Sequence, residues 1–271
     1  MKRILTAAVA LPVLIYTVWS EIPYFFVALA TVSVFLALRE FYKLAWKVEC
    51  RADPIPGHLS ALLVVACFVF DRPVYIPSVL AALAIAALAF ALSRPDKLDR
   101  SLASVSATVF GVVYTALLAG YLIGIRMAPD APGTTRLAPK LLTMFFALVM
   151  MTDTGAYYAG RALGRHKLAP RISPGKTVEG SVGGFLAAVI TGPLCKLIFF
   201  PEISIAHAAA LGAALGILGQ VGDLAESMLK RGAGVKDSGN LLPGHGGMLD
   251  RVDSILFCAP VVYYYSRLLI A

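Results

Sequence analysis

The chain has 271 residues, of which 59% are hydrophobic and only 15% are charged, and its mean hydropathy is +0.78. A soluble globular domain carries about one quarter charged residues, so this composition excludes an ordinary soluble fold and indicates an integral membrane protein. The formal net charge of +8 is explained by basic loops on one side of a membrane, so no nucleic acid partner is expected.

Nine apolar segments approach the length of about 20 residues that a helix needs to cross a bilayer. In chain order they are residues 4–19, 22–38, 59–70, 76–92, 102–125, 141–159, 182–200, 204–221 and 255–270. None shows the alternation of apolar and polar residues that marks a barrel strand. The sequence therefore predicts an all-α polytopic integral membrane protein with about nine transmembrane helices.

Lysine and arginine are concentrated in alternate loops. If the N-terminus is cytoplasmic, the cytoplasmic segments are 1–3, 39–58, 93–100, 160–181 and 222–253, and these hold 18 of the 24 Lys and Arg residues. The positive-inside rule then predicts a cytoplasmic N-terminus. We expect a multi-pass protein of the cell (inner) membrane, with no cleaved signal peptide. The four cysteines form no CxxC pair, so neither a disulfide framework nor a zinc site is expected.

Membrane-edge carboxylates and glycine-rich loops are concentrated in the second half of the chain. We therefore predict an N-terminal transmembrane region, 1–140, of about five helices. A C-terminal catalytic transmembrane region, 141–271, would follow with about four helices and the cytoplasmic loops 160–181 and 222–253.

Asp153 falls at the cytoplasmic end of the sixth apolar segment. An ionised and unpaired carboxylate is costly in hydrocarbon, so its side chain should face the protein interior or water. Asp153, Tyr157 and Gly160 share one helical face at positions i, i+4 and i+7. This face either contributes to a functional site or hydrogen-bonds a neighbouring helix.

The stretch "SPGKT" precedes the seventh segment. Ser173, Lys176 and Thr177 offer hydroxyls, an ammonium and free backbone N–H groups in a turn, which suit a phosphate group. The GxxxxGK[ST] spacing of a Walker loop is absent. Thr177 could instead only cap the following helix.

The end of the eighth segment places a carboxylate, a hydroxyl and an ammonium on one helical face, since Asp223, Ser227 and Lys230 follow the i, i+4, i+7 spacing. Upstream glycines predict a small surface for close helix packing. They are Gly212, Gly216 and Gly219.

Two more aspartates, Asp250 and Asp253, share a face where the last helix begins, directly after a glycine-rich loop. Hard carboxylate oxygens suit Mg²⁺, which commonly binds through one or two carboxylates and substrate phosphates. Cations surround these acids in the sequence: Lys230, Arg231, Lys236, His245 and Arg251. Such a set is typical of phosphoryl or nucleotidyl transfer. The alternative is a solvated loop whose charges only follow the positive-inside rule.

The same stretch resembles the signature of the phosphatidate cytidylyltransferases, also called CDP-diacylglycerol synthases. The matching positions are Ser227, Lys230, Arg231, Lys236, Asp237, Gly239, Pro243, His245, Gly246, Gly247, Asp250, Arg251 and Asp253. The segments "DTGAYYAGRALGRHKLAPRISPGKTVEG" and "GDLAESMLKR" are also similar to that family, so the resemblance covers about residues 150–254.

The resemblance implies that CTP and phosphatidate react to CDP-diacylglycerol and pyrophosphate at the cytoplasmic membrane face, with Mg²⁺, alone or with a second cation, and in a homodimer. We expect the metal on Asp223, Asp250 and Asp253. The expected catalytic residues are Asp223, Lys230, His245, Asp250 and Asp253. The expected substrate-binding residues are Asp153, Ser173, Lys176, Thr177, Ser227, Arg231, Lys236 and Arg251.

Other functions fit less well. The CDP-alcohol phosphotransferases have a DG, AR and GxxxDxxxD pattern that is absent here, as are the motifs of acid-phosphatase-type lipid phosphatases. A cation-coupled transporter could use Asp153 and Asp223 to bind an ion. However, the acids are predicted to gather at one membrane face and not at the midplane.

Overall fold

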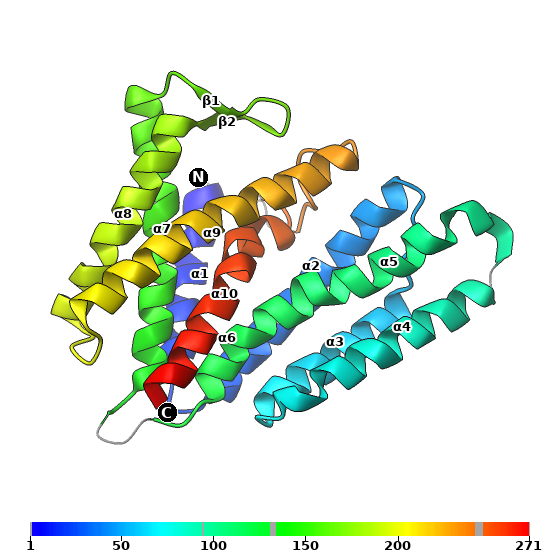
Figure 1. Ribbon diagram of the computed structural model, residues 1–271, viewed down its shortest axis with the longest axis horizontal. Coiled ribbons are helices and arrows are strands. Elements are labelled where there is room, and N and C mark those ends of the chain that lie inside the picture. Colours follow the sequence, from blue (N-terminus) through cyan, green and yellow to red (C-terminus); the bar gives the residue numbers. More distant parts are fainter. Residues whose placement is uncertain (1, 94, 131–133, 242–245, 271) are drawn as a thin grey trace. The chain divides into compact units, whose positions relative to one another are not determined.

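The computed structural model describes residues 2–93, 95–130, 134–241 and 246–270 (Figure 1). Its elements are α1 (Lys2–Trp19), α2 (Tyr24–Lys47), α3 (Pro54–Val69), η1 (Pro73–Tyr75), α4 (Ile76–Leu92), η2 (Pro95–Arg100), α5 (Ser101–Val112), η3 (Val113–Leu117), α6 (Leu118–Met127), α7 (Leu137–Leu163), β1 (Lys167–Ala169), β2 (Ser173–Thr177), α8 (Val178–Ile198), α9 (Ile205–Gly232) and α10 (Leu249–Ile270). Eight of the nine predicted apolar segments each lie in one of these helices, apart from one or two residues at some ends, and the segment 102–125 runs through α5, η3 and α6.

Six helical runs in the described residues are long and apolar enough to cross a membrane. They are Tyr24–Lys47, Pro73–Leu92, Leu98–Met127, Leu137–Leu163, Val178–Ile198 and Ile205–Gly232. Two further apolar helices are shorter, Ala8–Trp19 and Pro54–Val69. The predicted all-α, multi-pass membrane class is therefore confirmed, whereas the count of nine spans is not.

The chain forms two compact units. The first contains residues 1–127 and 229–252, and the second contains residues 128–228 and 253–271. The helices α9 and α10 each contribute residues to both units. The predicted boundary at residue 140 concerned function and stays a prediction.

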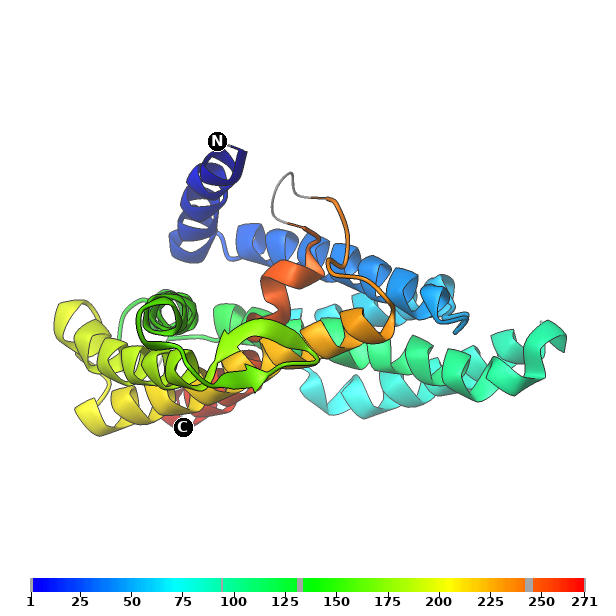
Figure 2. The same cartoon turned by 90° about the horizontal axis from the view of Figure 1, so that it is seen from above.

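In the first unit, α2 packs against α3 and α5 around the buried side chain of Tyr42. The Tyr42 hydroxyl donates a hydrogen bond to the Thr108 carbonyl oxygen at 2.9 Å. The ring leaves no room for a Cβ atom at Gly57 or Gly111. Nearby, α3 and α4 run antiparallel and side by side, while α1 is steeply inclined to α2 (Figure 2).

One long apolar helix of this unit is interrupted by a π-helical turn, η3, between α5 and α6. A π turn contains one residue more than an α turn. Before η3, Gly111 packs against Tyr42, and after it Gly120 packs against Phe68. Both parts of this helix, α5 and α6, contact α2 and α3.

In the second unit, α7 and α8 pack closely through small residues. A Cβ atom on Gly155 would lie 2.5 Å from the Cβ atom of Ala187, and one on Gly184 would lie 2.7 Å from the carbonyl oxygen of Thr152. Between the two helices, β1 and β2 form an antiparallel hairpin that pairs Lys167 with Thr177. The hairpin thus returns the chain directly to the start of α8.

The predicted glycine surface of α9 is confirmed. Gly212 faces the Ala188 carbonyl of α8, and Gly219 faces Cys258 of α10. Such contacts let backbones approach closely where lipid provides no hydrophobic drive for association.

This packing makes Gly183 sensitive to one added methyl group. Its Cβ atom would lie 2.2 Å from the Cβ atom of Ala159, so we expect Gly183→Ala to lower the free energy of unfolding by about 2 kcal/mol. The thermal unfolding midpoint in detergent measures this. The matched control is Gly232→Ala, where a Cβ atom would meet nothing within 4 Å; an equal midpoint for both variants would contradict the prediction.

Candidate active site

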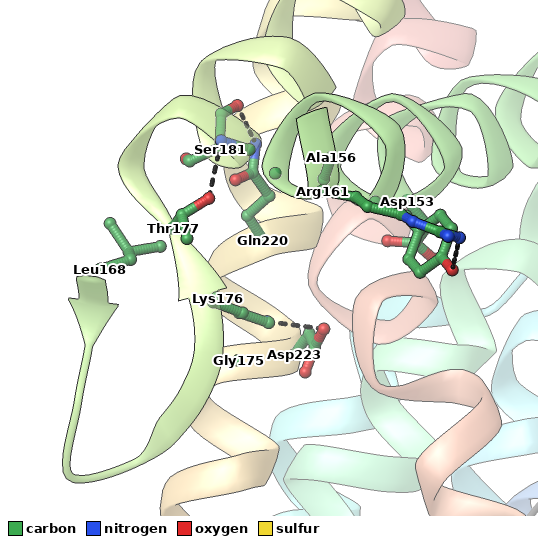
Figure 3. Close-up of a pocket in the computed structure, with 13 residues that line it drawn as sticks. Asp153, Ala156, Arg161, Leu168, Gly175, Lys176, Thr177, Ser181, Gln220 and Asp223 are labelled. Atoms are coloured by element: carbon green, nitrogen blue, oxygen red, sulfur yellow. Dashed lines mark hydrogen bonds and ion pairs between the residues drawn. The ribbon is translucent and has the colours of Figure 1, made fainter. Parts of the chain in front are cut away.

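A cavity of about 390 Å³ opens in the second unit, between α7, the hairpin, α8 and α9 (Figure 3). Its wall combines carboxylates, cations, an amide and hydroxyls with small residues. The lining residues are Asp153, Ala156, Tyr157, Gly160, Arg161, Leu168, Gly175, Lys176, Thr177, Gly180, Ser181, Gln220 and Asp223. All three predicted clusters therefore contribute to one cavity. The clusters around Asp153 and Lys176 each supply several residues, and the third supplies its first residue, Asp223.

An ion pair joins the hairpin to α9 in this cavity. The Lys176 ammonium lies 2.6 Å from Asp223 Oδ2, and the two side chains are 27% and 34% exposed (Figure 3). Because about a third of each side chain is exposed, both charged groups are accessible to a ligand. A phosphate could therefore take the ammonium, and a cation the carboxylate, without a change of fold.

The α7 wall presents the face predicted from the i, i+4, i+7 spacing. Asp153, Tyr157 and Gly160 all line the cavity, and Arg161 Nη1 donates to the Tyr157 hydroxyl at 3.3 Å. Gly160 lies where α8 begins, since its Cβ atom would be 3.1 Å from Thr177 Oγ1. The expectation that the Asp153 side chain faces water or protein is thus met at the cavity.

Thr177 has the capping role that the sequence left open as an alternative. Its side-chain oxygen accepts a hydrogen bond from Gly180 N at 3.1 Å and so caps the start of α8. It is buried and also lines the cavity. Ser173 begins β2 at the end away from α8.

Two cavity-related residues were missed by the sequence analysis. Gln220 of α9 lines the cavity and donates to the Ser181 carbonyl oxygen at 3.1 Å. Glu179, at the start of α8, accepts from Arg165 N at 3.0 Å and pairs with His166 Nδ1 at 2.6 Å. Glu179 thereby holds the turn between α7 and the hairpin that carries Lys176. Glu179 lies within the segment that resembles the family, where Lys176 and Thr177 were singled out instead, and Gln220 lies just before the quoted helical stretch with Asp223.

The first unit contains most of the stretch that resembles the family signature, residues 227–253, which is called the signature loop below. Lys230 Nζ lies 2.6 Å from Asp250 Oδ1, and their side chains are 12% and 6% exposed. Asp250 Oδ2 also accepts from Ser238 N at 3.0 Å, from Ser238 Oγ at 3.0 Å and from Gly247 N at 2.7 Å. Asp250 therefore anchors this loop to α9, a role that spacing alone did not indicate.

A glutamate from α2 completes this loop. Glu40 is 6% exposed, and its Oε2 accepts from Ser238 Oγ at 3.0 Å and from Leu249 N at 2.9 Å. These partners follow Glu40 by 198 and 209 residues. No local pattern could have identified the contact.

The remaining predicted residues lie as follows. Ser227 Oγ donates to Asp223 Oδ1 at 3.4 Å, which agrees with their shared helical face. Arg231 Nη1 donates to the Val235 carbonyl oxygen at 3.0 Å. Lys236 and Arg251 are exposed. His245 lies outside the described residues.

The backbones of α9 and α10 approach closely beside two aspartates of the second unit. A Cβ atom on Gly222, next to Asp223, would lie 2.7 Å from the backbone carbonyl oxygen of Asp253. Across the described ranges, no group of three or more His, Cys, Asp or Glu residues is arranged to hold a metal ion. Two carboxylates with substrate phosphates are nevertheless a common Mg²⁺ site. The three-aspartate set stays a prediction.

Comparison with known proteins agrees with these features. The sequence profile of the cytidylyltransferase family matches residues 1–269. A phosphatidate cytidylyltransferase of Synechocystis sp. is 35% identical, and the alignment covers 99% of this chain and 97% of that protein. A phosphatidate cytidylyltransferase of Bacillus subtilis is 43% identical over 58% of this chain, which spans about half (56%) of that protein's length. The protein of the same name in Staphylococcus saprophyticus is 52% identical over 43% of this chain and 45% of its own length.

Proposed function

Because the chain belongs to the cytidylyltransferase family, we propose that it converts CTP and phosphatidate into CDP-diacylglycerol and pyrophosphate, as a phosphatidate cytidylyltransferase of phospholipid biosynthesis. The full-length similarity to the Synechocystis protein of that name supports this proposal. The structural observation that carries it is the Lys176–Asp223 pair in a polar cavity, within a chain built of membrane-length helices. Such a cavity can receive a phosphate whose acyl chains stay in the bilayer.

The reaction needs charge neutralisation more than proton removal. The second pKa of a phosphate monoester is about 6, so the phosphatidate headgroup is already a nucleophilic oxyanion near pH 7. One of its oxygens attacks the α-phosphorus of CTP. The bond from that phosphorus to the bridging oxygen of the β-phosphate breaks, and the electron pair leaves with pyrophosphate. The main obstacle is repulsion between two polyanions, which cations reduce.

The residues of the second unit would divide this task. Lys176 would neutralise a phosphate oxygen in the cavity, Gln220 Nε2 joins α9 to α8 through the Ser181 carbonyl oxygen, and Thr177 caps the start of α8. Asp223 and Asp253 would hold Mg²⁺, which when bound neutralises phosphate charge and polarises the phosphorus centre. Asp153 of α7 also lines the cavity and would support the site from there.

The predicted roles of the signature loop are retained in this proposal. Asp250 joins the metal-binding set, Lys230 orients phosphate, and Lys236, His245 and Arg251 neutralise the triphosphate and the leaving pyrophosphate. Ser173, Ser227 and Arg231 contribute further phosphate contacts.

We place the protein in the cell membrane with the site facing the cytoplasm, because 18 of the 24 Lys and Arg residues fall in the loops assigned to that side. CTP then arrives from water and phosphatidate from the surrounding bilayer. A homodimer completes the proposed assembly.

The decisive experiment uses the purified full chain in detergent with CTP and phosphatidate. We expect pyrophosphate and CDP-diacylglycerol to form in equal amounts, and EDTA to stop both until Mg²⁺ is restored. Diacylglycerol, which lacks the phosphate nucleophile, serves as the control lipid and should give no product. If phosphatidate gives no pyrophosphate above this control, the proposed reaction is wrong. If turnover continues in EDTA, only the proposed metal requirement is wrong.

A further inference from the structure

Glu40 is a carboxylate buried in the half of the chain to which the sequence analysis gave no function. It belongs to α2, and its Oε2 accepts from the Ser238 hydroxyl and from the backbone N–H of Leu249. Leu249 is completely buried and begins α10. A helix start needs acceptors for its first N–H groups, so Glu40 supplies one for the helix that carries Asp250.

The Ser238 hydroxyl links two carboxylates. Its Oγ lies 3.0 Å from Glu40 Oε2 and 3.0 Å from Asp250 Oδ2. A hydroxyl has one proton to donate, so it can satisfy only one of these oxygens at a time. The backbone N–H groups of Ser238 and Gly247 donate to Asp250 as well. The positions of Glu40 and Asp250 are therefore coupled through a short, buried network.

The Glu40 side chain also leaves no room for a Cβ atom at two glycines of the signature loop. A Cβ atom on Gly239 would lie 2.6 Å from Glu40 Oε1 and 3.0 Å from its Cδ, and the three nearest atoms all belong to Glu40. At Gly247 a Cβ atom would lie 2.3 Å from Glu40 Oε2 and 2.3 Å from Ser238 Oγ. Gly239 has no positive φ angle. A larger residue is therefore disfavoured at position 239 by the clash with Glu40 and not by backbone conformation.

We propose that Glu40 is a positioning residue for the reaction: it fixes the signature loop at two places, residues 238–239 and 247–249, and thereby fixes the Asp250–Lys230 pair. This gives the N-terminal transmembrane half a direct part in building the site. The inference rests on the proposed function, because its main readout is the formation of CDP-diacylglycerol.

A double-mutant cycle between positions 40 and 239 tests the proposal. We expect Glu40→Ala to lower kcat about tenfold or more, since two donors lose their acceptor, and Gly239→Ala to lower it by a similar factor, since the new methyl group displaces Glu40. In the double variant the methyl group has room, so we expect no loss beyond that of Glu40→Ala. The expected coupling is thus about tenfold.

Two controls separate positioning from a general loss of structure. Glu40→Gln keeps an acceptor of the same shape, so we expect kcat within about threefold of wild type, and Gly239→Ala should remain harmful in that background. Gly232→Ala, which adds a methyl group in open space, should have no effect in any background. A purely structural role would couple the thermal unfolding midpoints of the two variants but would leave kcat of the folded protein unchanged, so coupling in kcat is the result that indicates positioning.

Three outcomes would overturn the inference: wild-type kcat in Glu40→Ala, an equal fold loss from Gly239→Ala in both backgrounds, or Glu40→Gln as inactive as Glu40→Ala. If Glu40→Ala does not yield monodisperse protein, Glu40→Asp takes its place, because the shorter side chain withdraws from Gly239 and should relieve Gly239→Ala in the same way. Failure of the proposed function can be distinguished from failure of this inference, because wild-type protein would then form no CDP-diacylglycerol. In that case the thermal unfolding midpoints of the single and double variants would still measure the Glu40–Gly239 contact.

Discussion

Asp223→Asn should reduce the rate of CDP-diacylglycerol formation by at least about a hundredfold while leaving the fold intact. The carboxylate is one third exposed and faces the cavity, where it pairs with Lys176. An amide of the same shape keeps the packing of α9 but neither holds a divalent cation nor fixes the lysine. Initial rates with saturating CTP and phosphatidate measure the effect, and the thermal unfolding midpoint in detergent checks the fold.

The control for Asp223→Asn is Asp99→Asn, which alters another accessible ion pair, that with Arg100 at 3.8 Å. We expect its rate to stay within about twofold of wild type, because exposed pairs contribute about 0–1 kcal/mol. Should Asp223→Asn keep more than a third of the wild-type rate, Asp223 is neither a metal ligand nor a phosphate-orienting residue.

Lys230→Met should lower both stability and activity. Its ammonium and the Asp250 carboxylate are 12% and 6% exposed, and removing one partner of a buried pair leaves an uncompensated charge. We expect the free energy of unfolding to fall by about 3–5 kcal/mol, with activity below detection at wild-type assay concentrations. Unfolding in detergent, followed by temperature or denaturant, measures the first effect.

A second substitution separates these two losses. In Lys230→Met combined with Asp250→Asn the buried charge is gone, while the amide oxygen still accepts from Ser238 and Gly247. We expect most of the stability to return and the activity to stay lost. As a comparison, Lys140→Met breaks the more exposed pair with Glu202 and should cost only about 1 kcal/mol. Recovered activity in the double variant would show that this pair only stabilises the fold.

Hydropathy was sufficient to locate the helices but not their ends. The eighth apolar segment ends at residue 221, whereas α9 continues to Gly232, as the helical spacing of Asp223, Ser227 and Lys230 predicted. Hydropathy reports where the solvent changes and not where helical hydrogen bonding stops. The stretch with Asp223 and Lys230 is polar, yet its side chains still follow the helical period. The hairpin was missed as a pair of strands, because β1 and β2 have only three and five residues.

Spacing along one helix predicted which side chains share a face, whereas contacts between distant segments could not be predicted. The shared face of Asp153 and Tyr157 depends only on the 3.6-residue period, and the structure confirms it. The partnership of Lys176 with Asp223 depends on how the hairpin folds back over α9. The hydrogen bond between Glu40 and Ser238 joins residues that are 198 positions apart. The periodicity of a single helix gives no information about contacts at this separation.

The π turn between α5 and α6 has a consequence for deletions in this protein. The five residues of a π turn cover about the same rotation as four α-helical residues at about 100° each. Removing one residue from Val113–Leu117, so that the turn becomes regular α-helix, would therefore leave the helix after it close to its present rotation. Gly111 could then still face Tyr42, and Gly120 could still face Phe68. The π turn thus accommodates one residue without changing the rotational phase between the two halves of one membrane-length helix, and a single-codon deletion at this point should be less harmful than one elsewhere in the same helix.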